Sequence, residues 1–122
     1  MEMKPESLPI IFEGAGWSIR GTEWGGMMVG LYTFPAGTDM KPLLAGMPDD
    51  LCQCPHWGYV LKGRIRISYR DHDQVISSGE LFYAEPGHSP YFEEDTQLIE
   101  FDPKEAWYTM MAGVSKNSAG LQ

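Results

Sequence analysis

Short runs in which apolar and polar residues alternate recur along most of this chain, and glycine or proline often separates one run from the next. An alternation with a period of two is typical of β-strands that bury one face. The chain contains 14 glycines and 9 prolines, so the pattern predicts many short strands joined by tight turns. The expected strands are residues 17–20, 27–34, 56–61, 64–69, 74–77, 81–84 and 97–101.

The end of the chain has a different pattern, in which apolar residues recur at helical spacing. Asp102 is a suitable N-cap, Pro103 is favoured at the first helical position, and Glu105 stands where a capping box needs it. We therefore predict a C-terminal helix that begins near residue 103 and frays over residues 115–122. The apolar positions that would dock it are Trp107, Met110, Met111 and Val114.

These elements predict a single domain. A chain of 122 residues with 43% hydrophobic residues is large and apolar enough to fill one core. Residues 1–13 are interpreted as an N-terminal arm and residues 14–102 as the β-barrel. Residues 103–122 are interpreted as a helix and tail that belong to the same domain.

The charge of the chain argues against a nucleic-acid partner. Seventeen acidic residues face nine basic ones, which gives a net charge of -8. Phosphate backbones are bound by clusters of lysine and arginine, and a surface this acidic repels them. The densest basic group is Lys62, Arg64, Arg66 and Arg70. Alternate spacing puts the first three on one face, which is interpreted as the solvated side of a strand, with a small anion-contact stripe as the alternative.

No membrane partner is expected either. The sequence has no run of roughly 20 apolar residues, the length needed to cross a bilayer. Residues 1–6 lack the basic and apolar regions of a secretory signal. We therefore expect a cytoplasmic protein with reduced thiols. Only one residue separates Cys52 from Cys54, so the pair is expected to serve chemistry or packing and not a disulfide.

Cys52, Cys54 and His56 form a candidate metal site. Side chains alternate along an extended segment, so these three would point to the same side, and Pro55 favours an extended backbone at Cys54. Thiolate and imidazole suit zinc or another borderline-soft divalent metal. His88, after the Pro86-Gly87 turn, is the best fourth ligand. The alternative is that both thiols are small buried apolar groups and that His56 is hydrogen-bonded in the core.

Residues 34–101 resemble a cupin. The segment 56–63, His-Trp-Gly-Tyr-Val-Leu-Lys-Gly, is similar to the end of the first cupin motif, and residues 79–88 are similar to the second. Residues 34–38 match the Pro-x-Gly turn that precedes the first motif. The resemblance implies an all-β fold, a double-stranded β-helix or jelly-roll barrel, with the short helix after it. It also implies a metal held by two histidines and a glutamate of the first motif and one histidine of the second.

The chain departs from the family pattern at the metal ligands. His56 stands where the glutamate is expected, Cys52 where the second histidine is expected, and Asp50 where the first is expected. Motif register thus gives Asp50, Cys52, His56 and His88, whereas ligand chemistry gives Cys52, Cys54, His56 and His88. We prefer the second set for zinc, because aspartate competes poorly with thiolate for a soft site. A third possibility is a degenerate site without metal.

Several functions are compatible with this site. One is an enzyme that acts on a small polar metabolite through the metal. The others are a non-catalytic binding module or sensor and a barrel with a purely structural metal. Glu100 is either an inward general base or an exposed strand residue. Resemblance to cupins, which often dimerise, also favours a homodimer. The expected pocket residues are Trp57, Tyr59, Tyr83, Tyr91 and Phe92, whose default role is core packing.

Overall fold

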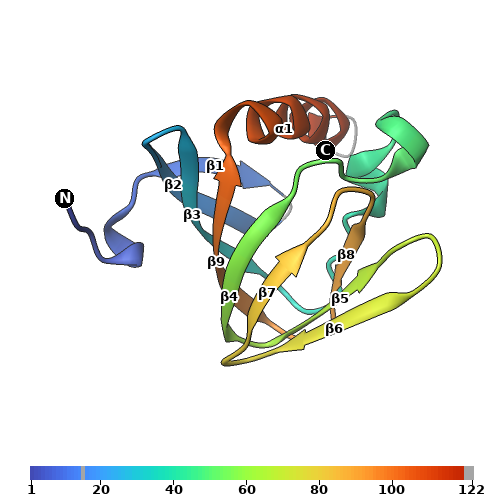
Figure 1. Ribbon diagram of the computed structural model, residues 1–122, viewed down its shortest axis with the longest axis horizontal. Coiled ribbons are helices and arrows are strands. Elements are labelled where there is room, and N and C mark those ends of the chain that lie inside the picture. The colour runs from blue at the N-terminus through green and yellow to red at the C-terminus, as the bar shows by residue number, and fades with distance from the viewer. Residues whose placement is uncertain (15, 120–122) are drawn as a thin grey trace.

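The computed structural model describes residues 1–14 and 16–119, which form nine strands, three short 3-10 helices and one α-helix (Figure 1). The strands are β1 (Ile10–Gly14), β2 (Trp17–Trp24), β3 (Met27–Phe34), β4 (His56–Lys62), β5 (Arg64–Ser68), β6 (Asp73–Ser77), β7 (Leu81–Ala84), β8 (Ser89–Phe92) and β9 (Thr96–Pro103). The helices are η1 (Pro5–Ser7), η2 (Lys41–Leu44), η3 (Pro48–Asp50) and α1 (Lys104–Ala119).

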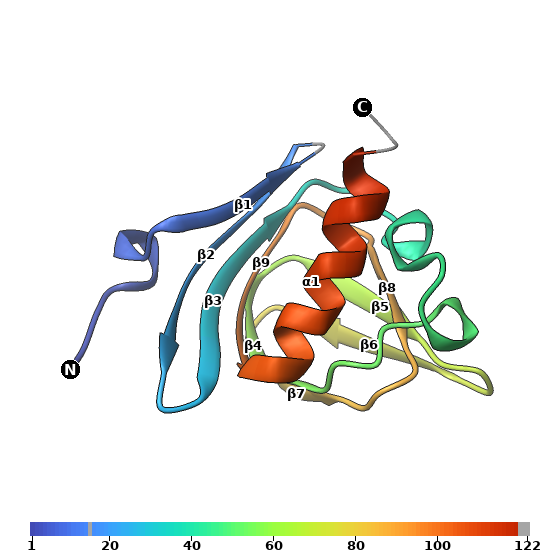
Figure 2. The same cartoon turned by 90° about the horizontal axis from the view of Figure 1, so that it is seen from above.

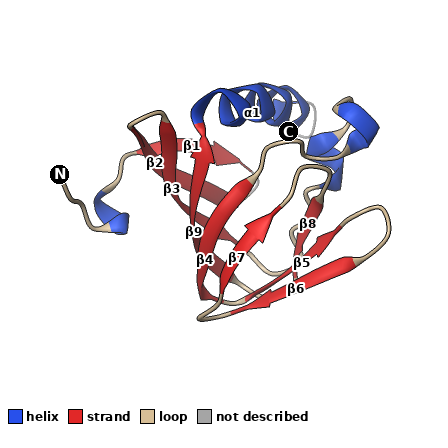
Figure 3. Ribbon diagram, in the orientation of Figure 1, coloured by secondary structure: helices blue, strands red, loops and turns tan. Residues whose placement is uncertain are grey.

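The strands form two antiparallel sheets that enclose one core (Figure 3). The larger sheet has the order β1-β2-β3-β9-β4-β7, and the smaller has the order β6-β5-β8. Helix α1 lies across one end of the barrel, as Figure 2 shows from above. None of the helices in the described part of the chain is long and apolar enough to cross a membrane. The predicted all-β barrel with a C-terminal helix is confirmed.

Glycine allows two of the tight connections in this barrel. Gly25 and Gly26 join β2 to β3 and both have positive φ, 57° and 83°, as a two-residue type I′ hairpin turn requires. Gly63, between β4 and β5, has a φ of 94°, and a Cβ there would collide with the backbone of Asp95. The turn predicted at Lys62-Gly63 therefore depends on glycine both for its φ and for the lack of a side chain.

Two strands that the pattern does not predict lie at sheet edges. Strand β1 pairs only with β2, and its register shifts between Ile10 and Phe12. That irregularity breaks the period of two that sequence analysis looks for. Strand β8 contains Pro90, which an edge strand tolerates because proline donates no backbone hydrogen bond. Residues 10–13, interpreted as part of the arm, thus belong to the larger sheet.

The rest of the arm covers part of the barrel. Leu8 is buried, and its carbonyl accepts a hydrogen bond from Arg20 Nη1 at 3.1 Å. Val29 and Leu31 of β3 are also buried outside the main core cluster, and η1 contacts β3. The segment therefore shields the apolar residues of one strand from water.

The C-terminal helix is longer than predicted. It continues to Ala119, and Ser118 is buried, so residues 115–119 are not frayed as expected. Residues 120–122 lie outside the described part of the chain. Trp107, Met111 and Val114 are buried against the barrel, as the helical spacing of these residues predicts.

Replacing Leu98 by alanine is expected to lower the free energy of unfolding by about 2–5 kcal/mol, because it leaves a cavity in the core. Leu98 is 3% exposed on β9. Leu81 is 82% exposed, so Leu81→Ala is the matched control and should change stability by less than about 0.5 kcal/mol. Urea unfolding followed by circular dichroism measures both. Equal effects of the two substitutions would contradict the assignment of the core.

Candidate metal centre

A backbone bridge brings Cys52 and His88 together although 35 residues separate them. The two residues form an isolated antiparallel bridge. Cys52 N donates to His88 O at 2.7 Å, and Gly87 N donates to Cys52 O at 2.7 Å. The segment before β4 and the turn before β8 are therefore held at a fixed separation, and so are the Cα atoms of the two candidate ligands.

His56 is the first residue of β4, and it faces two carboxylates of β9. The strand pairing places Gly58 opposite Glu100 and Trp57 opposite Phe101. His56 Nδ1 lies 2.8 Å from Asp102 Oδ1 and 3.1 Å from Glu100 Oε1. Glu100 is thus an inward, buried residue and not an exposed one.

Cys52, His56 and His88 converge inside the barrel. Their ligand atoms lie within 4.8 Å of one another, and all three residues are buried. Cys52 Sγ is 3.6 Å from His56 Nε2. Gln53 between them is exposed, so the alternation of faces predicted for this segment holds. Cys54 is buried as well, but it lies in a second group with His56 and Asp102.

Both histidines present Nε2 for binding. His56 Nδ1 is engaged by carboxylates, and His88 Nδ1 contacts the carbonyl oxygen of Glu85. Among the described residues, His88 Nε2 is the buried side-chain nitrogen or oxygen that lacks a hydrogen-bond partner. A metal-binding imidazole characteristically donates its other N–H to a carboxylate or a backbone carbonyl. The structure therefore fits a metal ion bound by Cys52 Sγ and the two Nε2 atoms.

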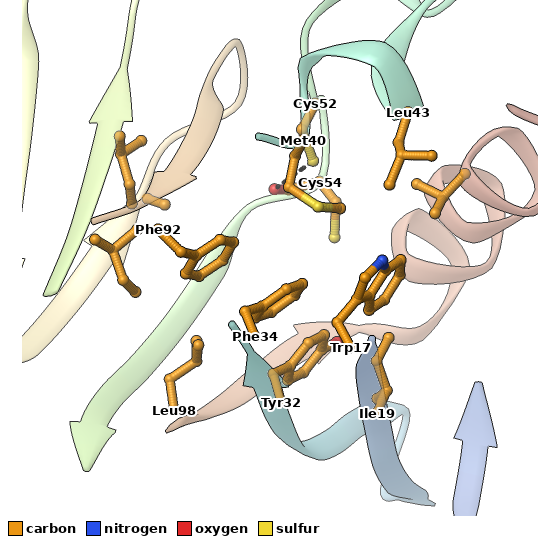
Figure 4. Packing of buried hydrophobic residues seen from close by; sticks show 14 of the residues in the cluster. Trp17, Ile19, Tyr32, Phe34, Met40, Leu43, Cys52, Cys54, Phe92 and Leu98 are labelled. Carbon is orange, nitrogen blue, oxygen red and sulfur yellow. Dashed lines mark hydrogen bonds between the residues drawn. The ribbon is translucent and has the colours of Figure 1, made fainter. Parts of the chain in front are cut away.

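The second group fits a metal less well. In this group His56 Nδ1 and Asp102 Oδ1 are already hydrogen-bonded to each other at 2.8 Å. Burial raises the pKa of the Cys54 thiol to about 11. A neutral thiol in this position packs as a small apolar group. Figure 4 shows Cys52 and Cys54 projecting into the buried cluster from the same segment.

The polar groups here have shifted pKa values. Burial alone would lower the pKa of His56, but the charges of Glu100 and Asp102 raise it well above its usual value. Burial and the charge of Asp102 raise the pKa of Glu100 to about 8. Burial, with a smaller effect of His56, lowers the pKa of His88 to about 4. His88 is therefore a neutral imidazole at neutral pH, which is the form that binds metals.

A hydrogen-bonded chain supports Asp102 from behind. Trp107 Nε1 donates to Tyr32 Oη at 2.7 Å, and Tyr32 Oη donates to Asp102 Oδ2 at 3.3 Å. Burial raises the pKa of Tyr32 well above its usual value, so the hydroxyl keeps its proton for Asp102. The sequence analysis did not predict that Tyr32, Asp102 or Trp107 belongs to the site, because these contacts join distant parts of the chain. Asp102 was expected to cap the helix, but its side chain turns into the barrel.

A partly open cavity of about 60 Å³ lies in the barrel beside these groups. Cys52, His56, His88 and Glu100 line it together with mainly apolar side chains. The aromatic part of the lining is a stack in which the ring centroids of Trp17 and Phe34 are 5.2 Å apart and those of Phe34 and Phe92 are 3.9 Å apart. The space is smaller than the roughly 150 Å³ that admits a benzene molecule.

Four aromatic residues expected to line the pocket lie elsewhere. Trp57, Tyr59, Tyr83 and Tyr91 are 37–44% exposed, and none lines the cavity. Alternation along β4 and β7 directs the first three outward, where Trp57 and Tyr83 pack together with ring centroids 5.0 Å apart. These four residues, expected near the mouth of a pocket, therefore do not line the cavity beside the candidate ligands.

Asp50, the ligand suggested by motif register, is also outside the centre. Asp50 is exposed, and its carboxylate accepts a hydrogen bond from Gly46 N at 2.9 Å. It lies in η3, which breaks the extended backbone that would have carried it inward. His72, expected to be exposed, is exposed and contacts Asp71.

Replacing Tyr32 by phenylalanine is expected to destabilise the protein by about 1–3 kcal/mol, because it leaves the buried Trp107 N–H without its acceptor. Tyr108 is 53% exposed, so Tyr108→Phe is the matched control and should be nearly neutral. Chemical unfolding of both variants measures the difference. A neutral Tyr32→Phe variant would show that the chain of hydrogen bonds is dispensable.

Solved structures resemble this fold. An RmlC-like cupin from Shewanella frigidimarina superposes with a TM-score of 0.59 at 18% identity, over 83% of this chain and 88% of that one. KdgF from Halomonas sp. superposes with a TM-score of 0.58 at 19% identity, over 80% and 90%. HppE, for which an Fe(II)-bound form is known, gives 0.57 at 13% identity, over 84% and 59%. No protein-family model and no curated protein matches the sequence. The chain therefore has the fold of a small single-domain cupin, as the motif resemblance implied.

Proposed function

We propose that this protein is a metal-dependent cupin enzyme that binds one transition-metal ion through Cys52, His56 and His88. A single observation carries the proposal: three donors from two distant segments converge in a buried space, and His88 Nε2 has no other partner among the described residues. A buried imidazole nitrogen without a hydrogen bond costs free energy. A bound metal would remove that cost.

The charges around the centre support the same proposal. Glu100 and Asp102 are both buried, and His56 is the basic group that pairs with each of them. Two buried carboxylates are expensive unless positive charge offsets them. In the metal-free protein a proton on His56 supplies that charge, because the carboxylates raise the pKa of His56 well above its usual value. A metal ion at Nε2 would replace this proton. The carboxylates would in turn hold the ring in place and increase its basicity.

The arrangement leaves room for chemistry. Three protein ligands leave a position of a tetrahedral metal open, whereas four would close it. The ion would act as a Lewis acid toward whatever occupies that position. Glu100 lines the cavity and contacts His56, so its carboxyl is the group placed to hold or release a proton there. The Cys-His-His set by itself suits zinc.

The cavity limits the molecule that would react. About 60 Å³ accommodates one or two water-sized molecules, since a water takes roughly 30 Å³ in the liquid. A larger substrate would need α1 to move, because Met110, Met111 and Val114 of that helix line the cavity. The lining is mostly apolar, so the reacting molecule would be very small or have an apolar body with one polar group.

The small cavity also favours a second candidate, a barrel in which the metal has only a structural or sensing role. The two differ in what metal removal does, because the free energy of binding to a structural site is folding free energy.

Metal binding is tested by titrating chelator-treated protein with zinc in a calorimeter. We expect one ion per chain. His88→Ala should weaken zinc binding by about 100-fold or more, beyond the 10–100-fold typical of residues that only support a ligand. His72 is exposed, so His72→Ala is the control and should bind as the wild type does. Absence of binding of both zinc and copper(II), or equal effects of the two substitutions, would overturn the proposal.

Removing the metal is expected to leave the barrel folded, because the core cluster consists of apolar side chains of which only Cys52 is a proposed ligand. Bound ligand at 100 times its dissociation constant adds about 2.7 kcal/mol of stability. Chelator-treated protein should therefore keep its circular dichroism spectrum and melt at a lower temperature than the zinc-loaded form. Unfolding on chelation would instead assign the metal a structural role and reject the enzyme.

A further inference from the structure

Helix α1 brings a second sulfur to the proposed metal centre. The thiol of Cys52 lies 3.3 Å from Met110, measured from Sγ to Sδ. Met110 is half-buried and lines the same cavity as Cys52, His56 and His88. One side of this cavity therefore presents a thiol, a thioether and two imidazoles.

We propose that Met110 is a fourth, weak ligand and that the centre prefers copper to zinc. This inference rests on the proposed metal site and adds to it the identity of the ion. A thioether bound weakly at the fourth position can be displaced by a reacting molecule, so it does not close the site as a fourth strong ligand would. Thioether sulfur is a soft ligand that favours copper and contributes little to zinc, which is held by thiolate, imidazole and carboxylate. Two histidines and a cysteine with a distant methionine are the donor set of protein sites that hold copper in both oxidation states.

The fold holds three of the four donors rigidly and the fourth less so. This suits three strong ligands and one weak ligand. Cys52 and His88 are tied by the backbone bridge between them, and His56 is fixed by Asp102 and Glu100. Met110 comes instead from a helix packed across the end of the barrel (Figure 2). A flexible thioether can keep a longer separation from the ion than the other ligands do. The Irving–Williams order adds to the preference, because copper(II) binds most N and S sites more tightly than zinc.

Met111 provides a matched control for Met110. It is the next residue of α1, lines the same cavity and is buried, whereas the sulfur contact of Cys52 in the described structure is made to Met110. Leucine conserves the volume of methionine, so Met110→Leu and Met111→Leu should both fold, at a cost below about 1.5 kcal/mol. Circular dichroism checks the fold of each variant.

The experiment titrates chelator-treated protein, under nitrogen, with copper(II) and separately with zinc. We expect one copper per chain and an intense visible absorption from charge transfer between the Cys52 thiolate and copper(II). Met110→Leu should shift that absorption. In a separate measurement with copper(I), by competition with a coloured copper(I) chelator, Met110→Leu should lower the affinity by about 10-fold. Met111→Leu should change neither the absorption nor the affinity for copper(I). The affinity for zinc should be the same in the wild type and in both variants.

The outcomes separate this inference from the proposed function. Zinc binding without the copper absorption, or copper binding that Met110→Leu leaves unchanged, would overturn the role of Met110 and keep the metal site. Failure to bind either ion would overturn both. X-ray absorption of the copper-loaded wild type gives a test that needs no variant: two sulfur ligands at different distances support the inference, and a single sulfur rejects it.

Discussion

The structure depends on keeping two carboxylates inside an apolar barrel. Glu100 and Asp102 alternate inward along β9 with Leu98, so the strand that builds the core also carries two ionisable carboxyl groups into it. His56 lies against both carboxylates and is itself buried. Charge of this kind persists in a low-dielectric interior only when protons, hydrogen bonds or a cation compensate it. Tyr32 of β3 supplies part of that compensation by its hydrogen bond to Asp102, and Trp107 of α1 holds the Tyr32 hydroxyl in place.

The same constraint explains how the candidate ligands are oriented. Because the carboxylates engage Nδ1 of His56, Nε2 is directed toward Cys52. The carbonyl of Glu85 has the corresponding effect on His88. The two rings therefore present the same nitrogen to one space, although one is fixed by side chains of β9 and the other by the turn before β8. Two unrelated parts of the chain therefore orient the two imidazole rings in the same way. A binding site needs such an arrangement, whereas the packing of two histidines in a core does not require it.

Local sequence pattern accounts for much of the fold and for part of the centre. Residues 27–34 and 81–84 are strands at the predicted positions, and the helix begins within one residue of the expected start. The burial of Cys52, Cys54 and His56 also follows from alternation. Strand β1 escapes detection because its bulge interrupts the period of two.

What local pattern could not give is contact between distant residues. Asp102 is 46 residues from His56 and 70 from Tyr32, and nothing near it in the sequence distinguishes an inward carboxylate from a helix cap. Met110 is read correctly as part of an apolar helix face, but the direction of its sulfur depends on how α1 packs. Trp57 and Tyr59 of β4 and Tyr83 of β7 were expected to line a pocket because they are aromatic. The alternation along these two strands directs their side chains outward instead.

The most direct test of this account is a crystal structure of the metal-loaded protein, with diffraction data collected on both sides of the absorption edge of the ion. The account predicts one anomalous peak inside the barrel, bonded to Cys52 Sγ and to Nε2 of His56 and of His88, at about 2.0–2.3 Å. A peak bonded to Cys54 and Asp102, or no peak within the barrel, would contradict it.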